Sequence, residues 1–265
     1  MAHGSERHVP LDAMSPFEIT LFNLMIVAFV FLAAGTSKGV LGVGIPLIAV
    51  PALSGVMHPA TTLAVIALPI LMSNFWQALE GRRFGPSCRR FWPAIPTMIL
   101  GGILGAQFIT AIDPRTAQSV LGVTVLVYAV SQLVNIRIPT PSVSAERIWT
   151  PIVGLLSGLL GGVAAYFGPP VIMYLLALRV TKEEFISSAA MLYLIGIVPV
   201  FGVLVLEGVL GRAELVLSVI GTVLILGAVA FGRWLREKVT QEAFRKALLV
   251  VLIVMAINML RRSML

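Results

Sequence analysis

The sequence has little charge, few histidines and a single cysteine, and each shortage excludes a class of protein. Only 12% of its 265 residues are charged, about half the fraction typical of a soluble domain. Cys88 is the single cysteine, so no intramolecular disulfide can form, and it belongs to no metal-binding motif. The sequence contains no catalytic triad, metal cluster or phosphate loop. We therefore expect neither an enzyme nor a metal or cofactor site.

Apolar residues dominate the chain instead. They make up 58% of it, and the mean hydropathy is +0.99. Many of the apolar runs are long enough to cross the roughly 30 Å hydrocarbon core of a bilayer. They lie at residues 18–36, 38–57, 60–80, 91–111, 116–135, 148–161, 162–178, 185–206, 213–232 and 243–260. The sequence predicts an all-α polytopic membrane protein with about 8–10 membrane segments.

The net charge of +7 comes mainly from short basic clusters between apolar runs. Such clusters orient membrane spans, since cytoplasmic loops carry an excess of Lys and Arg. We therefore expect the lipid bilayer, and no nucleic acid, as the partner of these charges. The two clusters predicted to be cytoplasmic consist of Arg82, Arg83, Arg89 and Arg90 and of Arg233, Arg236, Lys238, Arg245 and Lys246.

The chain divides into two similar halves. A polar N-terminal tail (1–17), which lacks the features of a signal peptide, precedes a first transmembrane repeat (18–135). A proline-bearing linker (136–147) then leads to a second repeat (148–265). Glycines recur at an offset of 119, as do two prolines, and Asp113 and Thr240 are suitable helix caps in corresponding places. The recurring residues are Gly35, Gly39, Gly42 and Pro51, matched by Gly154, Gly158, Gly161 and Pro170.

The basic clusters indicate how the halves are oriented. Both clusters lie in the cytoplasm if the two repeats are inverted, whereas parallel repeats would place the second cluster outside. The expected fold is therefore two inverted repeats. Each has a broken or re-entrant opening segment followed by three longer transmembrane helices.

The opening segment of the first half, 35–51, combines a cation with helix-breaking residues. Lys38 is costly at membrane depth, and Gly44 and Pro46 weaken or break a helix there. A broken apolar segment with a cation is typical of an anion-handling transporter site. The alternative is a kinked, tightly packed helix whose Lys38 reaches the headgroups.

The candidate site combines this cation with backbone and neutral donors. Glycines let backbone approach an anion, and hydroxyls and amides can donate hydrogen bonds to it. Asn74 and Gln77 share one helix face, with hydrogen bonding across helices as the alternative role. For the tyrosines the alternative is packing or interfacial anchoring. The candidate substrate-binding residues are Ser37, Lys38, Gly39, Gly42, Gly44, Asn74, Gln77, Ser157, Gly158, Gly161, Gly162, Tyr166, Pro170 and Tyr193.

Three motifs give the chain a family resemblance. The pattern G-x-x-K-G-x-x-G-x-G begins at Gly35, G-x-x-x-G-x-x-G begins at Gly154, and Pro169 and Pro170 follow. Over about residues 18–262 the chain resembles the TauE/SafE family of membrane permeases. The resemblance implies a multi-pass secondary transporter in the bacterial inner membrane. Its substrate would be a small anion, such as sulfite, sulfoacetate or an aromatic sulfonate, moved in either direction.

Rival functions remain open at this stage. An anion channel would use similar helix ends without conformational exchange, and a carboxylate transporter would use the same cation. A membrane scaffold or receptor would bind no substrate. A coupling ion, either a proton or sodium, and a homodimer are both compatible with the sequence.

Overall fold

The computed structural model describes residues 21–42, 44–80, 84–133, 141–238 and 240–264. These residues form eleven α-helices and no strand, which confirms the predicted all-helical class. The predicted tail (1–17) lies outside the described residues, as does the part of the predicted linker at 136–140. Helix formation resumes within that linker, at Val143.

The described helices fall into a short class and a long class. In chain order they are α1 (Leu21–Leu41), α2 (Ile45–Leu53), α3 (Pro59–Glu80), α4 (Phe84–Arg90), α5 (Ala94–Ala111), α6 (Pro114–Leu133), α7 (Val143–Ala164), α8 (Gly168–Ala177), α9 (Lys182–Leu206), α10 (Arg212–Leu235) and α11 (Gln241–Met264).

Seven helices of the described part are long and apolar enough to cross a membrane, namely α1, α3, α5, α7, α9, α10 and α11. The chain is therefore a multi-pass membrane protein. Helices α2 and α8, with 9 and 10 residues, are too short to span on their own. They occupy the apolar runs 38–57 and 162–178, which the sequence predicts as longer segments, because the preceding helices α1 and α7 continue into those runs.

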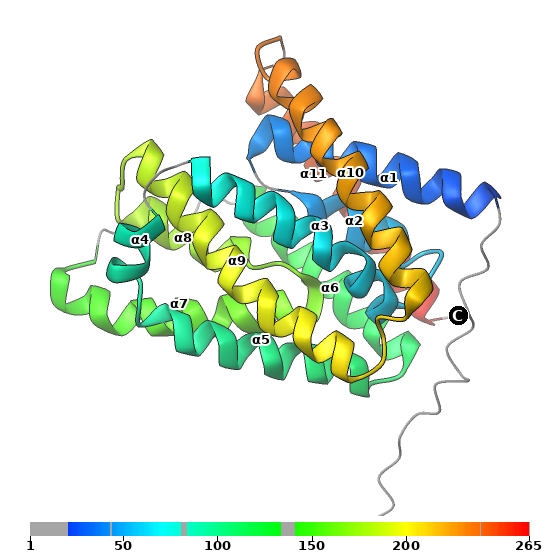
Figure 1. The fold of residues 1–265 in the computed structure, drawn as a ribbon, viewed down its shortest axis with the longest axis horizontal. Helices are drawn as coiled ribbons and strands as arrows, with labels where there is room; N and C mark the ends of the chain where they lie inside the picture. The colour runs from blue at the N-terminus through cyan, green and yellow to red at the C-terminus, as the bar shows by residue number, and fades with distance from the viewer. Residues whose placement is uncertain (1–20, 43, 81–83, 134–140, 239, 265) are drawn as a thin grey trace, which may run out of the picture.

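The long helices pack in pairs from opposite halves of the chain. Helix α1 packs on α10, α5 on α7, α3 on α9 and α6 on α11. Figure 1 shows α5 and α7 side by side along one edge, with α1 and α10 at the other and α3 and α9 between them. This pairing interleaves the two halves around a shared interior.

Glycines allow two of these pairs to approach closely. A Cβ atom added to Gly39 of α1 would collide with the backbone of α10 at Val229 and Gly232. A Cβ atom added to Gly158 of α7 would collide in the same way with the α5 backbone at Met98. Both contacts are the small-residue type that brings membrane helices together.

The first helix break lies between α1 and α2. The Gly42 N–H donates to the Lys38 carbonyl oxygen at 2.7 Å and ends α1. Gly42 and Gly44 have φ values of 80° and 133°, which only glycine adopts readily. Pro46, in the first turn of α2, lacks an N–H that the turn would leave unpaired. Helix α1 therefore ends at Leu41, later than the end of the predicted run at residue 36.

The second break lies between α7 and α8. Ala165 adopts the left-handed conformation with φ 55°, and its N–H donates to the Gly161 carbonyl oxygen at 2.7 Å. Pro169 and Pro170 lie in the first turn of α8. Both α2 and α8 thus have proline in the first turn and follow a residue with positive φ.

The two predicted caps precede helices. The Asp113 carboxylate accepts hydrogen bonds from the backbone N–H groups of Arg115 and Thr116 at 3.1 and 3.0 Å, which caps α6. Hydrogen bonding from Thr116 holds the pKa of the Asp113 carboxyl below its usual value. Thr240 immediately precedes α11, and its carbonyl oxygen accepts from the Phe244 N–H at 3.2 Å.

Candidate anion-binding site

Lys38 is buried in the last turn of α1, with only 7% of its surface exposed. Its ammonium donates to the Ser73 hydroxyl at 3.0 Å and to the Asn74 amide oxygen at 2.5 Å. Both partners are neutral residues of α3. Among the described residues, no aspartate or glutamate is buried. The ammonium is therefore hydrogen bonded, but its charge has no buried carboxylate to balance it.

Helix α3 also contacts the first break. Gln77 donates from its amide to the Gly42 carbonyl oxygen at 3.4 Å. Asn74 and Gln77 share a face of α3, as their spacing predicts, and this face contacts the end of α1. Ser73 is a partner that the sequence reasoning missed, although it directly precedes Asn74 in an apolar run.

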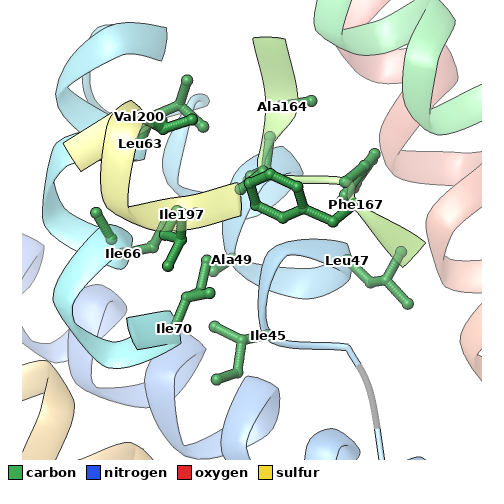
Figure 2. Packing of buried hydrophobic residues seen from close by; sticks show 14 of the residues in the cluster. Ile45, Leu47, Ala49, Leu63, Ile66, Ile70, Ala164, Phe167, Ile197 and Val200 are labelled. Atoms are coloured by element: carbon green, nitrogen blue, oxygen red, sulfur yellow. The ribbon is translucent and has the colours of Figure 1, made fainter. Parts of the chain in front are cut away.

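The two breaks line one cavity of about 50 Å³. This volume is several times the minimum needed for one water molecule. The cavity is lined by Lys38, Gly42, Gly44, Ile45, Pro46, Leu47, Ile70, Asn74, Tyr128, Ala165, Tyr166, Phe167, Gly168, Pro169, Ile172 and Tyr193. Figure 2 shows Ile45 and Leu47 from the first break in one cluster with Phe167 from the second. Segments more than 100 residues apart in the chain thus meet around Lys38.

Both short helices begin at this cavity. Ile45 and Gly168 are their first residues, and both line it. Neither helix start is capped by a side-chain hydrogen bond in the described part of the chain. The N-terminal N–H groups of a helix carry partial positive charge and bind anions readily. The cavity therefore combines one full positive charge with two helix ends of the same sign.

Two buried hydroxyls at the cavity have no partner. The phenol oxygens of Tyr166 and Tyr193 are buried, and no described residue forms a hydrogen bond with them. The ring of Tyr128 lies 5.8 Å from that of Tyr166, between centroids. The sequence predicted Tyr166 and Tyr193 as site residues but not Tyr128. The position of Tyr128 in the middle of an apolar run could have indicated it.

Seven of the fourteen predicted site residues lie at this cavity or its edge. Lys38, Gly42, Gly44, Asn74, Tyr166 and Tyr193 line it, and Gln77 bonds to Gly42 beside it. The other seven are Ser37, Gly39, Ser157, Gly158, Gly161, Gly162 and Pro170, none of which lines the cavity.

Most of these seven residues serve helix packing. Gly39, Gly158 and Gly162 face neighbouring helix backbones, and Gly161 faces the ring of Phe167. Larger side chains at these positions would push the helices apart. The glycines therefore affect the cavity indirectly, through the close packing of the helices around it.

The remaining three are placed differently. Ser37 and Ser157 are fully buried, and their hydroxyls have no hydrogen-bond partner among the described residues. Ser37 lies beside the first break, since a Cβ atom added to Gly44 would be 3.0 Å from its hydroxyl oxygen. Pro170 lies in the first turn of α8, next to the cavity-lining Pro169.

A second cavity of about 180 Å³ adjoins the first. The two cavities share Leu47, Tyr128 and Ile172 as lining residues. The second one is otherwise lined by apolar side chains and by the exposed Arg245 at the beginning of α11. The three shared residues therefore lie between the Lys38 cavity and a larger one that an exposed arginine also lines.

A family model, described as sulfite exporter TauE/SafE, matches residues 27–259. The chain belongs to the TauE/SafE family. The matched region contains Lys38, both breaks and all the residues that line the cavity, so the resemblance of the glycine motifs is confirmed over almost the whole chain. TauE/SafE membership and seven candidate spans make the protein a multi-pass membrane protein of a sulfur-anion exporter or permease family. The comparisons with curated proteins and with solved structures gave no match.

Proposed function

We propose that this TauE/SafE protein is a secondary transporter in the bacterial inner membrane. It moves a small anion, a sulfur oxyanion or an organosulfonate such as sulfite, sulfoacetate or an aromatic sulfonate, by alternating access. The observation that carries the proposal is the buried ammonium of Lys38, which has neutral partners and lies in a cavity lined by both helix breaks. An anion entering there meets the charge that the protein leaves unbalanced.

Two inverted repeats are the second part of the proposal. The short helices α2 and α8 begin at Ile45 and Gly168, which are 123 residues apart. The following helices α3 and α9 begin at Pro59 and Lys182, with the same separation. Helix α1 packs on α10 as α7 packs on α5, which is the exchange that a pseudo-two-fold axis between the halves produces.

The break residues support the same register. Gly42 and Ala165, the left-handed residues at the ends of α1 and α7, are also 123 residues apart. This separation replaces the 119 suggested by the glycine spacing alone. An offset of 119 would pair Lys38 with Ser157, whereas an offset of 123 pairs it with Gly161. The positive charge of the proposed site comes from one half only.

The second cavity supports a route to the site. Its exposed Arg245 belongs to a basic cluster that we expect to lie in the cytoplasm. In the proposed cycle, Leu47, Tyr128 and Ile172 form the barrier that closes the site from this side, and alternating access opens it.

Flux into proteoliposomes tests the function. The test compares sulfite, toluenesulfonate and acetate as substrates, each with and without the same anion inside the vesicles. We expect saturable uptake of a sulfur anion that internal anion accelerates, whereas a channel would show neither property. Uptake of acetate alone would instead indicate a carboxylate transporter.

Lysine variants test the site. Lys38→Met should abolish uptake, while Lys38→Arg keeps the charge and should retain part of it. Lys246→Met is the matched control, because Lys246 is exposed and pairs with Glu242 at 2.8 Å within α11. A Lys38→Met protein that transports like the wild type would overturn the proposed site.

A further inference from the structure

We infer that the central cavity selects monoanions, because one negative charge balances Lys38 and a second negative charge finds no cation there. The inference rests on the proposed function and makes its substrate class sharper. It assigns the site a singly charged oxyanion head group, such as hydrogen sulfite or a simple sulfonate, and excludes neutral analogues and dianions of the same shape. Among the proposed substrates, it thereby removes sulfoacetate and fully ionised sulfite, which carry two negative charges.

The charge inventory of the interior is the first argument. Lys38 is the one buried residue with a charged side chain in the part of the chain that the structure describes. Arg233 is close in the fold, since its backbone packs against Gly39, but its side chain does not line the cavity. A monoanion therefore leaves the loaded cavity neutral. A dianion leaves one uncompensated charge in a poorly polarisable interior, where charge is costly.

The hydrogen-bond donors are the second argument. An ammonium has three N–H donors, and Ser73 and Asn74 accept two of those of Lys38. No described residue accepts the third N–H of Lys38, and the unpartnered hydroxyls belong to Tyr166 and Tyr193, which line the cavity. Three donors with a single positive charge match a head group with several acceptor oxygens that share one negative charge. A neutral sulfone has oxygens but offers no charge to the ammonium.

The cavity walls are the third argument. Between the donors the lining is apolar and includes Ile45, Leu47, Ile70, Phe167 and Ile172. A second charge would need its own water shell, and a cavity of about 50 Å³ with such walls has room for only a few water molecules. The small volume and the apolar walls of the cavity therefore disfavour a dianion, as the charge balance does.

Three probes of similar shape and different charge provide the test. Methanesulfonate carries one negative charge, sulfate carries two and dimethyl sulfone carries none. Binding to the full-length protein in detergent is measured by thermal shift and calorimetry at constant ionic strength, since a ligand of the folded state raises the midpoint of unfolding. We expect methanesulfonate to bind at least tenfold more tightly than either of the others, and to lose that binding in Lys38→Met.

Asn74→Asp tests the charge balance within the protein. This change replaces the amide oxygen that accepts from Lys38 with a carboxylate oxygen of nearly the same shape. The ammonium then has an internal counterion, and we expect at least a tenfold loss of methanesulfonate affinity although Lys38 is retained. Asn258→Asp is the matched control, because Asn258 pairs with Arg261 near the end of α11, away from the cavity, and should bind as the wild type does.

The outcomes separate the two proposals. Lys38-dependent binding in which sulfate equals or exceeds methanesulfonate overturns the monoanion inference and leaves the transport site in place. Unchanged methanesulfonate binding by Asn74→Asp also overturns it. If no sulfur anion binds at all, both this inference and the proposed function are wrong. The comparison of probes on the wild type keeps the inference testable even where the Asn74 variant fails to fold.

Discussion

The ammonium of Lys38 and the amide oxygen of Asn74 lie 2.5 Å apart and join the last turn of α1 to α3. Gln77, one turn further along α3, donates to the carbonyl oxygen of Gly42 in the first break. Helix α3 in turn packs on α9, which carries Tyr193, another residue that lines the cavity. The ammonium is therefore positioned by side chains of the first half, on a helix that packs in turn against the second half.

Asn74→Ala should destabilise the protein even without ligand. The change leaves a buried cation with one hydrogen-bond acceptor fewer, which costs about 1–3 kcal/mol. Thermal or denaturant unfolding in detergent measures the loss. Asn258→Ala, which removes a hydrogen bond to Arg261, is the control and should change stability by no more than about 0.5 kcal/mol. Equal effects of the two variants would contradict the central role of the Lys38–Asn74 pair.

Gly39→Ala should be destabilising by about 1–3 kcal/mol, because the added methyl group collides with the α10 backbone at Val229 and Gly232. Gly227→Ala, within α10, is a matched control since no atom lies within 4 Å of its added Cβ. Alanine favours a helix over glycine by about 0.5–1 kcal/mol, so the control should be neutral or stabilising. The measurement is the midpoint of thermal unfolding, and a Gly39 variant as stable as the control would refute the close contact of α1 and α10.

Sequence reasoning located most of the fold because its signals are local. Long apolar runs predict spans, and glycine with proline predicts breaks, as at Gly44 and Pro46. The end of α1 was not predictable in this way, since the predicted apolar runs divide after residue 36, whereas α1 continues to Leu41 with Gly35 and Gly39 as packing contacts with α10. A glycine in a membrane helix can serve either purpose, and only the neighbouring helix decides which.

The candidate site was predictable to a smaller extent. Lys38 was found because a cation in an apolar run is conspicuous, and Asn74 because amides are rare there. Ser73 and Tyr128 were missed, since a serine or a tyrosine in a span is compatible with simple packing. Their proximity to Lys38 and Tyr166 depends on how α3 and α6 pack, which no local pattern encodes.

Acid should destabilise the beginning of α3 through His58. The Ala60 N–H donates to the Nδ1 atom of His58 at 3.2 Å, and burial lowers the pKa of the imidazole below its ordinary value of 6.5. The unfolded chain then binds the proton more readily, so stability falls as pH drops through about 6.5 toward the lower folded-state pKa. The midpoint of unfolding should fall more in the wild type than in His58→Asn between about pH 7.5 and pH 5.

Asparagine is the replacement of choice at this position because it also caps helix N-termini and does not titrate. Identical pH profiles for the wild type and His58→Asn would show that protonation of this histidine makes no contribution to acid sensitivity.

Tyr128→Ala should open the Lys38 cavity toward the second cavity, because Tyr128 is one of three residues that line both. A cysteine introduced by Ile70→Cys, in a Cys88→Ser background, reports on access to the Lys38 cavity. A membrane-impermeant thiol reagent applied to inside-out vesicles should label this cysteine several-fold faster in the Tyr128→Ala protein. Val250→Ala, an exposed position of α11, serves as control and should leave the labelling rate unchanged.

No aspartate or glutamate is buried in the described ranges, so the charge of Lys38 is unbalanced there and the protein should respond to membrane voltage. When the cavity holds a monoanion it is electrically neutral, whereas the empty cavity with a charged Lys38 carries one positive charge. The electric field then acts on the conformational change of the empty transporter and not on that of the anion-loaded transporter. Moving one full charge across the membrane changes the free energy of this step by up to about 2.3 kcal/mol per 100 mV. Net uptake should therefore depend on voltage, while exchange of anion for anion should not.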